Sequence, residues 1–134
     1  MKNFIALIIL LFLLGCSYNN DPDSEGCLTV ACTEEFRTIT ITVKYSNGTP
    51  VVFDSFKVID IKNKNDLTYE GWQSVNGIYP IFSDKYAFEY QNKVIKIEFS
   101  GVIDNKKVVS EVYTVGANCC HVYLKEGKDE LIIN

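Results

Sequence analysis

The clearest pattern in the chain is the strict alternation of apolar and polar residues over positions 36–45. Ile39, Ile41, Val43 and Tyr45 fall on one side, and three threonines and a lysine fall on the other. A repeat of two residues is that of a strand with one buried face. The pattern therefore predicts a half-buried β-strand over these ten residues.

Further short apolar runs follow, each bounded by turn-forming residues. Asn47-Gly48 predicts a tight turn, because both residues accept a positive φ. Pro80 has no backbone N–H, so its strand is expected at a sheet edge or a bulge. Residues 84–92 fit either a strand or a short helical turn. The other strands are expected at 51–61, 67–69, 77–82, 94–103, 107–115, 119–125 and 129–133.

No stretch has the pattern of a helix of useful length, and no internal repeat occurs. Seven or eight short strands at this spacing favour an all-β fold, a single antiparallel β-sandwich of Ig-like type. The expected hairpin between strands 94–103 and 107–115 turns at residues 104–106.

Two stretches resemble a known domain family. Residues 43–51, Val-Lys-Tyr-Ser-Asn-Gly-Thr-Pro-Val, are similar to the strand–turn–strand opening of carboxypeptidase-regulatory, transthyretin-like domains. Asn76-Gly77-Ile78-Tyr79, followed by Asp84, is similar to their later Gly-x-Tyr strand. The resemblance spans most of 36–125 and implies a transthyretin-like sandwich that serves as an accessory binding or structural module.

The N-terminus has the pattern of an export leader. Lys2 supplies a positive charge, and the apolar run 4–14 has the length of a signal-peptide core, which is too short to cross a bilayer as a helix. Leu13-Leu14-Gly15-Cys16 resembles the lipobox of bacterial lipoproteins, which implies cleavage before Cys16 and lipid on its sulfur. The alternatives are an ordinary signal peptide with an incidental cysteine, or a short membrane anchor.

These features divide the chain into a signal peptide at 1–15, a lipidated acidic tether with the first cysteines at 16–35, and a β-sandwich domain at 36–134. Residues 116–122, Gly-Ala-Asn-Cys-Cys-His-Val, also resemble small bacterial lipoproteins that share a Cys-Cys-His-Val strand. That resemblance implies no particular chemistry.

Negative charge is concentrated in the tether. The formal net charge is −4, and it becomes −5 when Lys2 leaves with the leader. From residue 36 onward acids and bases balance, which argues against a nucleic-acid partner. The acidic segment resembles the sorting signals of surface-exposed lipoproteins, with a solvated linker as the alternative. The absence of Asp directly after Cys16 favours, by resemblance, the outer membrane. The acidic residues before position 36 are Asp21, Asp23, Glu25, Glu34 and Glu35.

Four cysteines remain once Cys16 carries the lipid: Cys27, Cys32, Cys119 and Cys120. They allow three pairings. A bridge between neighbours 119 and 120 is disfavoured, because adjacent Cα atoms lie closer than disulfides usually require. Both remaining pairings tie the start of the domain to its end, and the sequence does not decide between them.

The pairing of Cys32 with Cys120 is slightly favoured, because Leu28, Val30 and Cys32 would share an apolar face in an extended segment. In a strand, Cys120 would point inward with Val122 and Leu124, and Cys119 would point outward with His121 and Tyr123. One bridge is therefore expected to be buried and the other to lie nearer the surface.

His121, the only histidine, lies beside two cysteines and invites a metal-site hypothesis. The spacing lacks Cys-x-x-Cys, and disulfides are favoured over zinc in an oxidising envelope. No nucleophile–base motif occurs, so we expect no enzyme activity, no cofactor, no metal and no catalytic residues.

A cluster of aromatic residues in the middle third could stack on sugar rings, although core packing is favoured. The expected function is a non-enzymatic, lipid-anchored binding or structural module at the outer membrane, periplasmic or surface-exposed. Its partners would be the membrane, through Cys16, and an envelope protein or glycan. The alternatives are a metal-binding or carbohydrate-binding surface protein or, less favoured, an extracytoplasmic enzyme. The aromatic cluster comprises Tyr69, Trp72, Tyr79, Tyr86, Phe88 and Tyr90.

Overall fold

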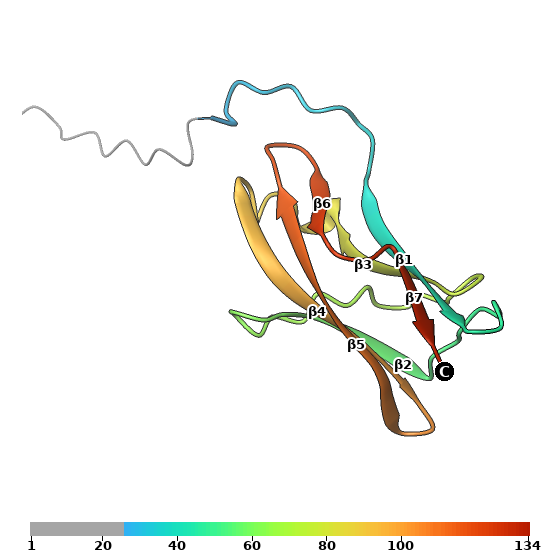
Figure 1. Ribbon diagram of the computed structural model, residues 1–134. Helices are drawn as coiled ribbons and strands as arrows, with labels where there is room; N and C mark the ends of the chain where they lie inside the picture. The colour runs from blue at the N-terminus through green and yellow to red at the C-terminus, as the bar shows by residue number, and fades with distance from the viewer. Residues whose placement is uncertain (1–25) are drawn as a thin grey trace, which may run out of the picture.

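The computed structural model describes residues 26–134, so the leader, Cys16 and the tether up to residue 25 lie outside the described residues. Two β-sheets pack face to face as a sandwich, and the blue N-terminal segment arches over one end of it (Figure 1). The elements are β1 (Thr38–Tyr45), β2 (Ser55–Asp60), β3 (Ile78–Ser83), the 3₁₀ helix η1 (Asp84–Tyr86), β4 (Lys93–Ile103), β5 (Lys106–Ala117), β6 (Val122–Glu126) and β7 (Glu130–Ile133).

One sheet has the strand order β3-β1-β7, and the other has the order β2-β4-β5-β6. Every strand pair is antiparallel except β1 with β7, which run parallel. The prediction of an all-β sandwich is therefore confirmed, with one parallel pair at the edge of the smaller sheet.

The alternating pattern of residues 36–45 is confirmed in β1. Ile41 and Val43 are at most 1% exposed and face the core. The opposite sheet contributes Ile97 and Phe99 from β4 and Tyr113 from β5, all fully buried. Burial of each such side chain contributes about 1.5–3 kcal/mol, so this inner layer accounts for much of the domain's stability.

The second predicted strand is shorter than expected, because residues 51–54 cross from one sheet to the other. Val51 and Phe53 are still buried in this crossover. The hydroxyl of Tyr79 donates to the carbonyl of Val51 at 3.0 Å and accepts from the N–H of Phe53 at 2.9 Å. A side chain thus satisfies backbone groups that a neighbouring strand would otherwise satisfy.

Residues 67–69 do not form the predicted strand. Asp66 makes an isolated bridge with Ile59, and Leu67 is buried in the core at 4% exposure. Leu67 is apolar because its side chain packs in the core, although its backbone is not part of a strand. The ambiguous residues 84–92 begin with the 3₁₀ helix η1 and continue in turns.

Other turn and edge predictions are confirmed. Pro80 lies in β3, an edge strand, where the register with β1 shifts. Gly48 has a φ of +85° in the turn after β1. Asp104 and Asn105, with φ of 49° and 61°, form the two-residue turn between β4 and β5, as expected for a hairpin of this twist. None of the helices within residues 26–134 is long and apolar enough to cross a membrane.

Candidate functional site

Two disulfides fasten the N-terminal segment to the bend between β5 and β6. Cys27 pairs with Cys119, and Cys32 pairs with Cys120, with Cα–Cα distances of 5.2 and 5.3 Å. This is the favoured one of the two long-range pairings. Structural disulfides persist in oxidising compartments, so they indicate a location outside the cytoplasm.

The reasoning behind that pairing is wrong in two respects. Cys119 and Cys120 lie in a bend, and β6 begins only at Val122, so strand alternation does not set their directions. Leu28 and Val30 are 82% and 45% exposed, so the first cysteines do not share a buried apolar face.

The expected difference in burial between the bridges is also wrong. Cys32 is exposed, and Cys27, Cys119 and Cys120 are partly exposed, so neither bridge lies in the core. His121, expected to point outward, is only 8% exposed. The bend turns the imidazole back toward the protein.

His121 joins two chain segments that are distant in sequence. Its Nδ1 lies 2.7 Å from a carboxylate oxygen of Asp84, and its Nε2 lies 2.9 Å from the hydroxyl of Thr33. The carboxylate of Asp84 also accepts the backbone N–H groups of Arg37 and Val122, each at 2.8 Å. We call this network, together with the two disulfides, the N-terminal clamp.

The environment of Asp84 keeps its carboxylate ionised. Burial alone raises the pKa of Asp84, but the hydrogen bonds from His121, Arg37 and Val122 outweigh that effect and hold the pKa below its ordinary value. The order hydroxyl, imidazole, carboxylate is also that of a nucleophile, its base and an orienting acid. In this protein each member also lies on a separate chain segment, so the network joins three parts of the chain.

Within residues 26–134, no group of three His, Cys, Asp or Glu side chains is placed to hold a metal ion. The four cysteines of the clamp are in disulfides and supply no thiolate. A zinc site of the type considered from the sequence would need those thiolates.

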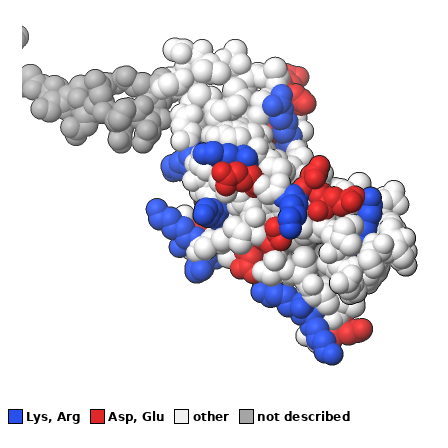
Figure 2. Space-filling view, viewed as in Figure 1, with Lys and Arg blue, Asp and Glu red and all other residues white. Residues whose placement is uncertain are grey.

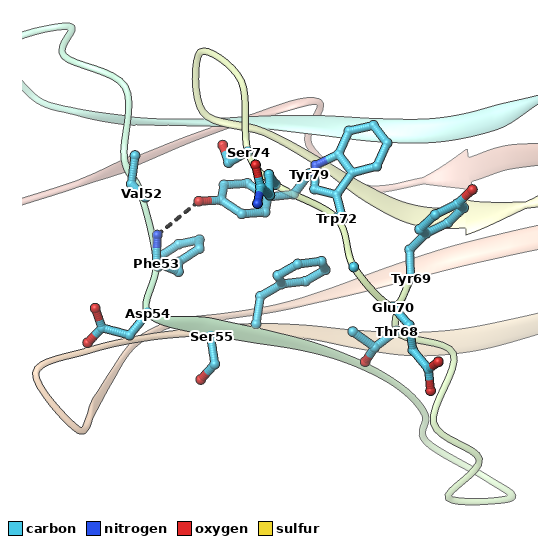
Figure 3. Close-up of a pocket in the computed structure, with 13 residues that line it drawn as sticks. Val52, Phe53, Asp54, Ser55, Thr68, Tyr69, Glu70, Trp72, Ser74 and Tyr79 are labelled. Atoms are coloured by element: carbon cyan, nitrogen blue, oxygen red, sulfur yellow. Dashed lines mark hydrogen bonds between the residues drawn. The ribbon is translucent and has the colours of Figure 1, made fainter.

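A second candidate site is a groove of about 490 Å³ between residues 52–56, at the crossover and the start of β2, and the 68–74 loop. Tyr79 lies at its base (Figure 3). We call it the aromatic groove. Tyr69 and Trp72 project from the loop, with ring centroids 5.7 Å apart in an edge-to-face arrangement. The indole N–H of Trp72 donates to the carbonyl of Ile78 at 3.0 Å, which fixes the orientation of the ring.

Polar groups line the same groove. Asp54 and Glu70 line its sides with carboxylates that point outward in Figure 3, and the Asp54 carboxylate accepts the backbone N–H of Asp104 at 2.7 Å. The hydroxyl of Ser74 is buried and has no hydrogen-bond partner among the described residues. A buried hydroxyl without a partner is unfavourable for stability. The groove thus combines aromatic surface with a few polar side chains, the pattern of a small-ligand site.

The aromatic cluster predicted from the sequence divides into core, groove and surface side chains, with Tyr86 partly buried against the core. Tyr79 and Tyr90 are buried at 2% and 3% exposure, as core packing predicts. Tyr69 and Trp72 line the groove. Phe88 lies on the surface, where its side chain is 87% exposed.

Sequence reasoning missed the roles of Thr33 and Asp84 in the clamp and of Ser74 in the groove. The available signal was the position of Asp84 directly after the Gly-x-Tyr strand. The partners of Asp84 come from two segments, at Arg37 and at His121–Val122, and only the fold brings them together. Comparison with protein-family models, with curated proteins and with solved structures finds no match to this chain.

Proposed function

We propose that this protein is a lipid-anchored, non-enzymatic binding module of the bacterial envelope, held at the outer membrane through Cys16. The lipobox-like sequence at residues 13–16 supports the anchor. The two disulfides support an extracytoplasmic location. The resemblance to carboxypeptidase-regulatory domains supports an accessory role, because such domains are usually binding or structural modules.

The proposed ligand is a glycan bound in the aromatic groove. The observation that carries this proposal is the pair of rings, Tyr69 and Trp72, in a groove that Glu70 also lines. The C–H faces of a sugar ring pack on aromatic rings, and sugar hydroxyls donate to carboxylates. Tyr69 is 41% exposed, so its ring surface is accessible to a ligand.

Binding of the purified protein to a panel of immobilised glycans tests this ligand. Tyr69→Ala and Trp72→Ala should each lower affinity at least ten-fold, because each removes a stacking surface. Tyr123→Ala is the matched control, since Tyr123 is also 41% exposed but lies on β6, outside the groove. Absence of binding to every glycan, or an equal loss in the Tyr123 variant, would refute the glycan proposal.

Metabolic labelling of cells with a fatty-acid probe tests the anchor. Cys16→Ala should abolish incorporation, whereas Cys27→Ala, a nearby cysteine placed in a disulfide, should keep it. Labelling that persists in the Cys16 variant would show that residues 13–16 are not a lipobox.

The competing class is an extracytoplasmic enzyme or metal carrier that uses His121, and the Thr33–His121–Asp84 network is the observation that favours it. Mass analysis of the mature protein separates the two. Two disulfides without metal would exclude the metal carrier, and four free thiols with bound metal would overturn the binding-module proposal. Turnover of an esterase or amidase substrate that is lost in Thr33→Ala would establish the enzyme.

A further inference from the structure

The N-terminal segment at one end of the domain is uncharged and exposes apolar side chains. Residues 26–33 contain no Asp, Glu, Lys or Arg. Figure 2 shows white surface at this end, next to the grey N-terminal residues. Leu28 and Phe88, at 82% and 87% exposure, are the two most exposed large apolar side chains among the described residues. We call this surface the apolar cap.

Leu28 and Phe88 belong to segments that meet at this end. Cys27, the neighbour of Leu28, is bonded to Cys119 and accepts a hydrogen bond from the side chain of Asn92 at 3.2 Å. The loop that carries Phe88 leads directly into Asn92 and is held by a backbone bond from Gln91 to Phe88. The apolar cap therefore surrounds the point where the tether enters the domain.

A groove of about 630 Å³ adjoins the cap, where β4 extends past the end of β2. Lys62, Lys93 and Lys96 line it, together with Val94, which is 46% exposed, and a single acid, Glu89. None of these three lysines forms an ion pair with another described residue. We call it the lysine groove, and Figure 2 shows blue side chains along this edge of the domain, below the white cap.

We propose that the apolar cap and the lysine groove form a membrane-contacting face that binds anionic phospholipid. Exposed apolar side chains enter the boundary between headgroups and acyl chains, and lysines beside them contact lipid phosphates. Long lysine side chains can lie along apolar surface while their ammonium groups reach the headgroups. Charge complementarity selects the anionic lipid, because the ammonium groups of this groove are not neutralised by the protein.

The orientation of this face rests on the proposed lipid at Cys16. Ten residues separate Cys16 from Cys27, and an extended chain spans at most about 3.3–3.6 Å per residue, so the tether reaches roughly 35 Å. The tether therefore keeps the cap within about that distance of the bilayer, close enough for it to contact the lipid surface. A second, electrostatic attachment adds to the lipid, as in other two-signal anchors.

The test uses residues 17–134 without lipid, so its failure is distinguishable from failure of the anchor proposal. This chain holds both sheets, the core and both disulfides, all of which lie within 26–134. Sedimentation with phosphatidylcholine vesicles containing 30% phosphatidylglycerol should show salt-dependent binding that pure phosphatidylcholine vesicles do not give.

Lys93→Glu with Lys96→Glu should lower vesicle binding at least ten-fold, because two favourable contacts become repulsive. The matched control is Lys106→Glu with Lys107→Glu, an equal charge change at the opposite end of the same hairpin. Phe88→Ser should also weaken binding, through loss of the apolar contact. Circular dichroism and the intact disulfides verify folding of each variant.

Three outcomes would overturn the proposal. The first is no binding to anionic vesicles, and the second is an equal loss in both lysine pairs, which would indicate unspecific attraction. The third is retention of poly-glutamate by the lysine groove without retention of vesicles, which would assign this face to an acidic protein partner.

Discussion

Removal of one hydroxyl group, in Tyr79→Phe, tests how the crossover between the sheets is held. The side chain of Tyr79 is 2% exposed, and its hydroxyl bonds the carbonyl of Val51 and the N–H of Phe53. The substitution keeps the ring in the core and leaves two buried backbone groups without partners. Each such group costs about 1–3 kcal/mol, so the expected loss is about 2–6 kcal/mol of unfolding free energy.

The structure offers a matched control in Tyr113→Phe. Tyr113 is fully buried, and its hydroxyl has no hydrogen-bond partner among the described residues. Burial, with the nearby acids Glu111 and Asp129, raises the pKa of Tyr113, so the hydroxyl stays neutral. Loss of an unsatisfied hydroxyl should be neutral or should stabilise the protein by up to about 1 kcal/mol. The same chemical change thus has opposite expected effects at the two sites.

Urea denaturation at pH 7 with both disulfides intact measures the two effects. The fluorescence of Trp72, the only tryptophan, and far-UV circular dichroism should report one transition with an unchanged slope. Because Trp72 lies in the groove beside Tyr79, agreement between the two probes excludes a purely local response. Equal shifts in the two variants, or a loss below about 0.5 kcal/mol for Tyr79→Phe, would refute the hydrogen-bond account.

Three further predictions concern the clamp and the sheet junction. Cys32→Ala with Cys120→Ala should lower the unfolding free energy by about 2–3 kcal/mol, measured in urea, because the Cys27–Cys119 bridge still closes the long loop and the second bridge closes only a ring of about eight residues; an unchanged midpoint would contradict this. Gly77→Ala should cost at least about 2 kcal/mol in the same assay, because φ is +72° and a Cβ would lie 2.3 Å from the carbonyl oxygen of Val43. The folded-state pKa of Asp84 is lowered from 3.8. The stabilisation of the fold by its ionised carboxylate is therefore fully present above pH 3.8 and is lost as the pH falls through the folded-state pKa. Acid titration of thermal stability should therefore be flatter for Asp84→Asn than for the unsubstituted protein, and parallel curves would refute the assignment.

Local patterns in the sequence determined most of the strands. The alternation in β1 set which face is buried, because the side chains of a strand alternate whatever the strand pairs with. Asp104-Asn105 set the β4–β5 turn, because such residues tolerate positive φ. Both properties belong to a few neighbouring residues, so no other part of the chain is needed to read them.

Cysteine spacing likewise limited the disulfides to two long-range pairings through bond geometry alone. Local reasoning of this kind could not predict which way the side chain of His121 points. A strand pattern predicted an outward side chain, whereas a bend before β6 turns it inward to Asp84, 37 residues earlier in the chain. A hydrogen bond over that separation has no local sequence signal.

Only the tertiary structure decided which surfaces form sites. The aromatic groove requires residues 52–56 and the 68–74 loop to face each other. The apolar cap requires Cys27 to contact Asn92. A strand was expected around both Tyr69 and Tyr79, yet Tyr69 is 41% exposed and Tyr79 is only 2% exposed. Their difference comes from the packing of distant segments, which the order of residues along one strand does not contain.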